Sequence, residues 1–131
     1  MTVFVDSSAL YALIDADDVN NRRAARSFTS LARNAVLVTH SYVCLETTAL
    51  LQRRIGLRAV RALVDDVLPA IKVEWVDEEL HGAATSACLA AGRREISLVD
   101  WTSFELMRRR AIATALAYDD DFVSQGFALA P

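Results

Sequence analysis

The sequence is poor in residues that interrupt or cross-link a chain. It has four glycines, two prolines and two cysteines among 131 residues, and no glycine or proline cluster forms a linker. We therefore expect one domain over residues 1–131, and neither a disulfide scaffold nor a disordered chain. Because Cys44 and Cys88 lie inside apolar patterns and form no CxxC pair, we expect two buried free thiols.

Long uncharged apolar runs are also missing. No segment reaches the roughly 18–20 residues that span a bilayer, and the first residues carry no basic region of a signal peptide. We therefore expect a cytoplasmic protein with no membrane contact. His40 and His81 have no Cys or His partner at ligand spacing, so a zinc site has no support.

Lysine is nearly absent, because Lys72 is the only one among the 14 basic residues. The arginines gather in four groups, at positions 22, 23 and 26, at 53, 54, 58 and 61, at 93 and 94, and at 108 to 110. Guanidinium groups pair bidentately with phosphate oxygens, so these groups are compatible with an anionic polymer as partner. Solvated helix faces explain any single group equally well.

Short apolar segments alternate with helical patterns along the chain. We expect strands at residues 2–5, 35–38, 71–76 and 111–116. Helices are expected at 9–16, from Asn20 or Asn21, from 41 to the arginine pair at 53, at 57–68, after Asp77, and from about 97–100 to the triple arginine. Ser7 or Ser8 is expected to cap the first helix and Ser41 the third. This alternation predicts a parallel sheet with helices on both faces.

Four carboxylates stand alone in otherwise uncharged apolar stretches: Asp6, Glu46, Asp100 and Asp119, which opens the triplet Asp119–Asp121. An isolated charge in apolar surroundings is costly unless it is compensated. Asp6 and Asp119 directly follow expected strands, and ligands of parallel sheets bind at the carboxyl ends of strands. We therefore expect these carboxylates to converge at that edge of the sheet.

Each carboxylate also has a purely structural interpretation. Asp6 and Asp100 are good helix caps, with Ser97 competing for the second cap, and the triplet makes an ordinary acidic turn. Glu46 is hardest to explain in this way, because its helical neighbours are apolar. Jointly, a cluster of carboxylates needs a cation, and an all-oxygen ligand set selects Mg²⁺ or Mn²⁺. Such a metal centre predicts hydrolysis of phosphodiester bonds by an activated water.

Four segments of the chain, residues 3–10, 41–48, 97–104 and 117–122 with Gly126 and Phe127, together resemble the PIN-domain ribonucleases, in particular the VapC-type toxins of bacterial type II toxin–antitoxin pairs. The resemblance covers nearly the whole chain. It implies a three-layer α/β/α sandwich with a mainly parallel sheet of four to five strands. It also implies an endoribonuclease that uses Mg²⁺ or Mn²⁺ and leaves 5′-phosphate and 3′-hydroxyl ends.

The same resemblance assigns roles to single residues. Asp6, Glu46, Asp100 and Asp119 match the catalytic and metal-binding acids, Asp121 is a supporting or alternative ligand, and Ser8 matches a hydroxyl that helps to hold the site. Ala117 departs from the family pattern, which often has Thr or Ser there, and this puts a second metal in doubt.

The expected partners are RNA, a cognate antitoxin protein and a second copy of the chain. The apolar helix surfaces at 11–14 and 49–51 are candidates to receive an antitoxin segment, although core packing also accounts for them. Two other functions stay open: a structure-specific DNA nuclease and a catalytically silent partner-binding domain. A phosphoreceiver is disfavoured, because it needs a lysine after the last strand and Lys72 precedes residues 73–76.

Overall fold

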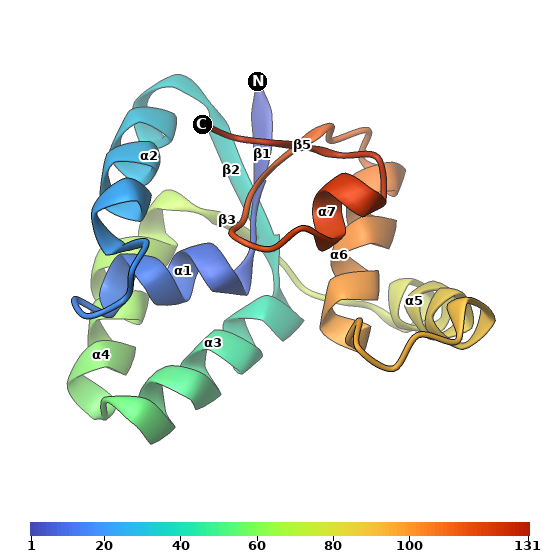
Figure 1. Ribbon diagram of the computed structural model, residues 1–131, viewed down its shortest axis with the longest axis horizontal. Coiled ribbons are helices and arrows are strands. Elements are labelled where there is room, and N and C mark those ends of the chain that lie inside the picture. The colour runs from blue at the N-terminus through green and yellow to red at the C-terminus, as the bar shows by residue number, and fades with distance from the viewer.

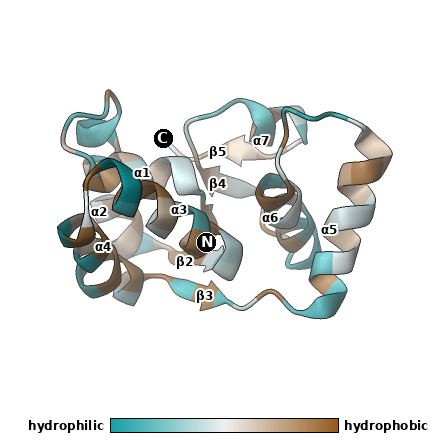
Figure 2. Ribbon diagram, turned by 90° about the horizontal axis from the view of Figure 1, so that it is seen from below, coloured by the Kyte–Doolittle hydropathy of each residue, from teal (hydrophilic) through white to brown (hydrophobic).

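Five short parallel strands form the centre of the molecule in a computed structural model that describes residues 1–131. They are β1 (Thr2–Val5), β2 (Val36–His40), β3 (Lys72–Glu74), β4 (Thr114–Leu116) and β5 (Ala128–Leu129). The strand order is β3-β2-β1-β4-β5, and every neighbouring pair is parallel. Figure 2 shows this order from the lower edge of the view to the upper one.

Helices cover both faces of the sheet, as Figures 1 and 2 show. On one side lie α1 (Ser7–Ile14), α2 (Asn21–Asn34) and α4 (Leu57–Ala62), and on the other lie α5 (Glu78–Ala91), α6 (Leu98–Arg109) and α7 (Asp121–Ser124). Helix α3 (Ser41–Arg54) crosses the carboxyl edge and contacts both α1 and α6. The expected α/β/α sandwich is confirmed, with a fully parallel sheet of five strands.

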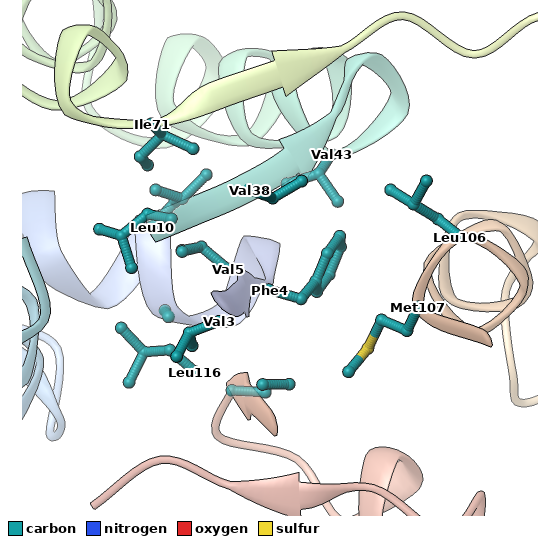
Figure 3. Packing of buried hydrophobic residues seen from close by; sticks show 14 of the residues in the cluster. Val3, Phe4, Val5, Leu10, Val38, Val43, Ile71, Leu106, Met107 and Leu116 are labelled. Atoms are coloured by element: carbon teal, nitrogen blue, oxygen red, sulfur yellow. The ribbon is translucent and has the colours of Figure 1, made fainter. Parts of the chain in front are cut away.

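The central strand β1 is buried on both sides, which explains its unbroken apolar sequence. Val3, Phe4 and Val5 are fully buried. Val5 packs toward Leu10 of α1, whereas Phe4 faces α6 and its Leu106 and Met107 (Figure 3). One strand therefore joins the two helical layers into a single core.

Two helix caps differ from the prediction. Helix α1 is capped by Asp6 and α3 by His40, not by the serines that follow them. Ser7, Ser8 and Ser41 lie inside the first turns instead, because the helices begin directly after these capping residues. Asp77 caps α5 as predicted, and of the two candidates for the cap of α6 it is Ser97, not Asp100, that takes the role. Their side-chain oxygens accept from the N–H groups of Leu80 and Asp100.

The cap at His40 is unusual, because its ring is completely buried. Its Nδ1 accepts from the backbone N–H groups of Tyr42 and Val43, at 3.2 and 3.3 Å. The proton must therefore lie on Nε2, which donates to Ser103 Oγ at 2.9 Å. Burial lowers the pKa of His40 to about 4, so the neutral ring joins the start of α3 to α6.

Two other segments depart from the expected elements. The predicted helix at 57–68 is split into α4, a π-helical turn (Leu63–Val67) and a 3-10 turn (Leu68–Ala70) that contains Pro69. The predicted strand at 111–116 starts only at Thr114, because Ala111 has a positive φ of 54° and the chain turns there. Both differences arise from turns that hydrophobic periodicity does not record.

Cys44 and Cys88 are free and only half-buried. The helices are all too short or too polar to cross a membrane.

Candidate active site

Four carboxylates from four different elements line one open cavity of about 430 Å³ at the carboxyl edge of the sheet. Asp6 follows β1, Glu46 lies on α3, Asp100 in the first turn of α6, and Asp119 in the loop after β4. Figure 1 shows why they meet: α1 and α3 both start where β1 and β2 end, and α6 approaches the same edge from the other layer. The predicted convergence of these four residues is what the fold produces.

Asp6 is the most deeply buried of the four, at 1% exposure. Its Oδ2 accepts from the N–H and hydroxyl groups of Ser8, at 3.2 and 2.7 Å, and this contact caps α1. Its Oδ1 has no hydrogen-bond partner. Burial, opposed by Ser8 and reinforced by the charges of Asp119 and Asp100, raises the pKa of Asp6 to about 7. A buried oxygen without a partner is unfavourable unless a ligand supplies one.

Ser8 connects two strands of the sheet through the site. Its hydroxyl donates to Asp6 and accepts from the backbone N–H of Tyr118 at 3.0 Å. Tyr118 directly follows Ala117 and precedes Asp119, so this hydroxyl fixes the loop after β4 relative to β1.

Ser7, the other serine of the pair, holds Glu46. Ser7 Oγ donates to Glu46 Oε1 at 2.5 Å, which fixes the orientation of a carboxylate on α3 from the first turn of α1. Sequence reasoning missed this role, because Ser7 was considered only as a helix cap. The signal was present in the adjacent serine pair: one hydroxyl serves Asp6 and the other serves Glu46.

Asp100 and Asp119 show the electrostatic cost of the cluster. Burial, reinforced by the negative charges of Asp119, Glu46 and Asp121, raises the pKa of Asp100 to about 6. Burial also raises the pKa of Asp119, against a hydrogen bond from the Asp121 backbone. Shifts of this kind mean that the ionised cluster lacks compensating positive charge.

The three aspartates of the triplet Asp119–Asp121 occupy different positions relative to the cavity. Asp119 lines the cavity, whereas Asp120 and Asp121 do not. The Asp121 N–H donates to Asp119 Oδ1 at 3.1 Å, at the start of α7. Asp121 therefore orients Asp119 and adds negative charge from the rim of the cavity.

The donor set fits a hard divalent cation in its chemistry. The four converging carboxylates offer only oxygen atoms, and Asp6 presents an unpartnered buried oxygen. No group of three or more Asp, Glu, His or Cys side chains is already arranged to hold an ion. Mutual repulsion favours such separation, and a cation would have to draw the carboxylates closer.

Aromatic and basic side chains also lie at this cavity, and the sequence alone did not identify them as part of the site. Tyr11 and Tyr118 line it, and each ring carries an arginine on its face: Arg54 at 5.3 Å from Tyr11 and Arg23 at 5.0 Å from Tyr118. These arginines belong to groups that the sequence indicated only as phosphate-compatible. Their position beside the acidic centre depends on tertiary packing.

The parallel five-stranded sandwich and its acidic edge are typical of one class of nuclease domains. The chain belongs to the PIN domain family, whose model it matches over residues 3–128. Among curated proteins it is 38% identical to the 23S rRNA-specific endonuclease VapC20 of Mycobacterium tuberculosis, over 95% of both chains. The crystal structure of that protein, described as a toxin that cleaves the sarcin–ricin loop, superposes with a TM-score of 0.86 at 37% identity and covers 96% of both chains.

More distant structures share the fold alone. FitAcB from Neisseria gonorrhoeae has a TM-score of 0.69 at 15% identity, with 100% of this chain and 97% of that one covered. VapBC2 from Rickettsia felis, bound to a promoter DNA fragment, has a TM-score of 0.73 at 14% identity, with 98% and 97% covered.

Proposed function

We propose that this protein is a metal-dependent endoribonuclease that acts as the toxin of a toxin–antitoxin pair. The observation that carries the proposal is the convergence of Asp6, Glu46, Asp100 and Asp119 on one cavity with an unpartnered buried oxygen. Membership of the PIN family and the similarity to an rRNA endonuclease over 95% of both chains support the same activity. The whole of residues 1–131 is then a single nuclease domain.

The four carboxylates would hold Mg²⁺ or Mn²⁺, with Asp119 as the fourth ligand and Asp121 in support. When bound, the metal supplies Lewis acidity at the phosphate and activates water for hydrolysis. The chain's own residues keep the donors in place. Ser8 orients Asp6, Ser7 orients Glu46, and the Asp121 N–H orients Asp119. The hydroxyls of Ser7 and Ser8 are engaged with these carboxylates, so we assign neither serine as a covalent nucleophile.

The substrate we propose is the sarcin–ricin loop of 23S rRNA. The relative whose printed activity is cleavage of this loop shares both the sequence and the fold over nearly the whole length of this chain. Sequence-specific recognition of RNA generally targets loops, where bases are unstacked and accessible. An open cavity at the edge of a sheet can admit such a loop but not a base inside a duplex.

The proposed protein partner is a cognate antitoxin, and the proposed assembly is a homodimer. An antitoxin that covers the acidic cavity would inhibit by exclusion of RNA. Tyr11 and Leu50, from the two apolar helix surfaces expected to receive such a segment, line this cavity.

Purified protein with Mn²⁺ is expected to cut a synthetic sarcin–ricin hairpin RNA once, and to leave a DNA hairpin of the same sequence intact. Glu46→Gln should reduce the rate at least about 100-fold, a larger loss than that from a residue outside the ligand shell. Glu78→Gln, at an exposed position of α5, is the matched control. Equal rates for the two variants, or no cleavage by the wild type with Mn²⁺ or Mg²⁺, would refute the proposal.

A further inference from the structure

Arg54 is an unpaired cation at the border of an acidic cavity. It ends α3 and takes part in none of the four ion pairs of the chain. Its guanidinium group instead lies over the ring of Tyr11, 5.3 Å from the centroid. A cation–π contact of this kind holds the group in place while its N–H donors stay available.

Arg54 also borders a second cavity, of about 410 Å³, which adjoins the first. Apolar walls come from Ile14, Ile55, Ala59 and Ala62, and polar groups come from Asp15, Asp17 and Arg58. This volume is within the range of small-ligand sites, and the mixture of apolar walls with a few charged groups is typical of them. Nothing in the proposed catalytic chemistry uses this cavity.

Gly56 places Arg58 beside Arg54. Its backbone, at φ 127° and ψ −174°, is in a region that essentially only glycine adopts, and it forms the boundary between α3 and α4. The Gly56 N–H donates to Leu51 O, and the Gly56 carbonyl accepts from Ala59. The sharp turn brings two arginines from consecutive helices to one cavity.

Arg54 stands between the two cavities, because it lines both of them, whereas Arg58 lines only the second. Glu46 and Arg54 are eight residues apart on one helix, which corresponds to about 12 Å along its axis. The second cavity therefore continues beyond the acidic centre, where a flanking part of the same RNA strand can reach it.

We propose that the cavity between α1, α3 and α4 is the subsite for a nucleotide next to the scissile phosphate. Arg54 and Arg58 pair with backbone phosphates on that side. The base lies against Ile14 and Ile55, and the carboxylate of Asp17 is available to accept from an amino group of the base. This subsite rests on the proposed ribonuclease function, and it names residues that select and position the RNA.

The test measures binding of the sarcin–ricin hairpin RNA by fluorescence anisotropy in the presence of Mn²⁺. All variants carry Glu46→Gln as well, so that RNA is cleaved too slowly to affect the measurement. Arg54→Ala and Arg58→Ala are each expected to weaken binding about 10-fold. Each should also lower the slope of log K against log salt by about 1, because one phosphate contact is lost. Arg53→Ala and Arg61→Ala are matched controls, since both are exposed neighbours that do not line the cavity.

Cleavage kinetics in the active background separate positioning from chemistry. Arg58→Ala should raise KM about 10-fold and leave kcat nearly unchanged, and Arg58→Lys should restore part of the loss. If both cavity variants bind RNA as tightly as the two controls and with the same salt slope, the subsite is refuted. That result leaves wild-type cleavage intact, whereas failure of the proposed function would abolish cleavage with any metal.

Discussion

Asp6 and His40 occupy equivalent places in the fold and have opposite electrostatic properties. Each lies at the carboxyl end of a neighbouring strand, each is almost completely buried, and each caps the helix that follows. Every ring nitrogen of His40 has a partner, whereas one oxygen of Asp6 has none. In this pair, the residue with complete hydrogen bonds has a structural role, and the residue with an unpartnered buried oxygen lies at the candidate ligand site.

The largest expected difference between the two positions concerns activity. Asp6→Asn should reduce RNA cleavage at least about 100-fold, because the site loses a negative ligand. Without metal at pH 8, the free energy of unfolding of the same variant should exceed that of the wild type by roughly 1–3 kcal/mol, because a costly buried charge is removed. Both quantities can be measured on one preparation, by cleavage assay and urea unfolding in EDTA.

The control for this variant is Asp66→Asn, at an exposed position far along the chain in the π-helical turn. It should change neither activity nor stability measurably. Asp6→Asn keeps an oxygen that can cap α1. If this variant is no more stable than the metal-free wild type at pH 8, the buried charge of Asp6 is not costly and the comparison with His40 fails.

His40→Ala should show the reverse pattern. Loss of the ring leaves two backbone N–H groups and Ser103 without their partner, and opens a cavity between β2, α3 and α6. We expect a loss of about 2–4 kcal/mol in the free energy of unfolding. The cleavage rate per folded molecule should fall much less, since His40 does not line the acidic cavity.

His40→Asn is the matching conservative variant, because asparagine is a good helix cap that can still accept from the start of α3. It should recover about 1 kcal/mol relative to His40→Ala in urea unfolding. An equal loss in both variants would mean that ring volume, and not the hydrogen bonds, explains the role of His40.

The smallest expected effect is a difference in pH dependence. The folded pKa of His40, about 4, lies below its unfolded value, so its contribution to stability is present above about 6.5 and is lost as pH falls toward 4. The folded pKa of Asp6, about 7, lies above its unfolded value, so its contribution is present below about 4 and is lost as pH rises through 7.

Unfolding in EDTA between pH 4.5 and 8 tests these opposite slopes. The stability gained by Asp6→Asn over the wild type should be largest at pH 8 and nearly absent at pH 4.5. The stability lost by His40→Asn should be largest above pH 6.5 and shrink toward pH 4.5. Parallel curves for all three proteins would show that neither buried group titrates in this range.

The sequence predicts the framework of this molecule well, because most elements have strong local signals. The fully apolar residues 2–5 mark the central strand, and Asp77 and Ser97 mark two helix starts. Strand β5 has only two residues and no pattern of its own, so nothing local identifies it. The π-helical turn after α4 is also invisible, since its side chains continue the helical period.

For the candidate site, the sequence identifies the charges but not their surroundings. Asp6, Glu46 and Asp100 stand out because each lacks charged neighbours in the chain, and Asp119 stands out because its triplet directly follows an uncharged run. The contact between Ser7 and Glu46, and the contact between Arg54 and Tyr11, each join segments about forty residues apart. Such contacts depend on how the helices cross, and local patterns carry no information about crossing angles.

The hydrogen bond from Tyr118 to Ser8 has a consequence for the order in which the protein becomes active. It joins residues 110 positions apart, and β1 pairs with β4 across a similar separation. A chain that is still being synthesised cannot place Asp119 opposite Asp6 until almost every other element has been made, and contacts of such long range form slowly. The acidic centre is therefore incomplete until residues from both ends of the chain have been made and paired.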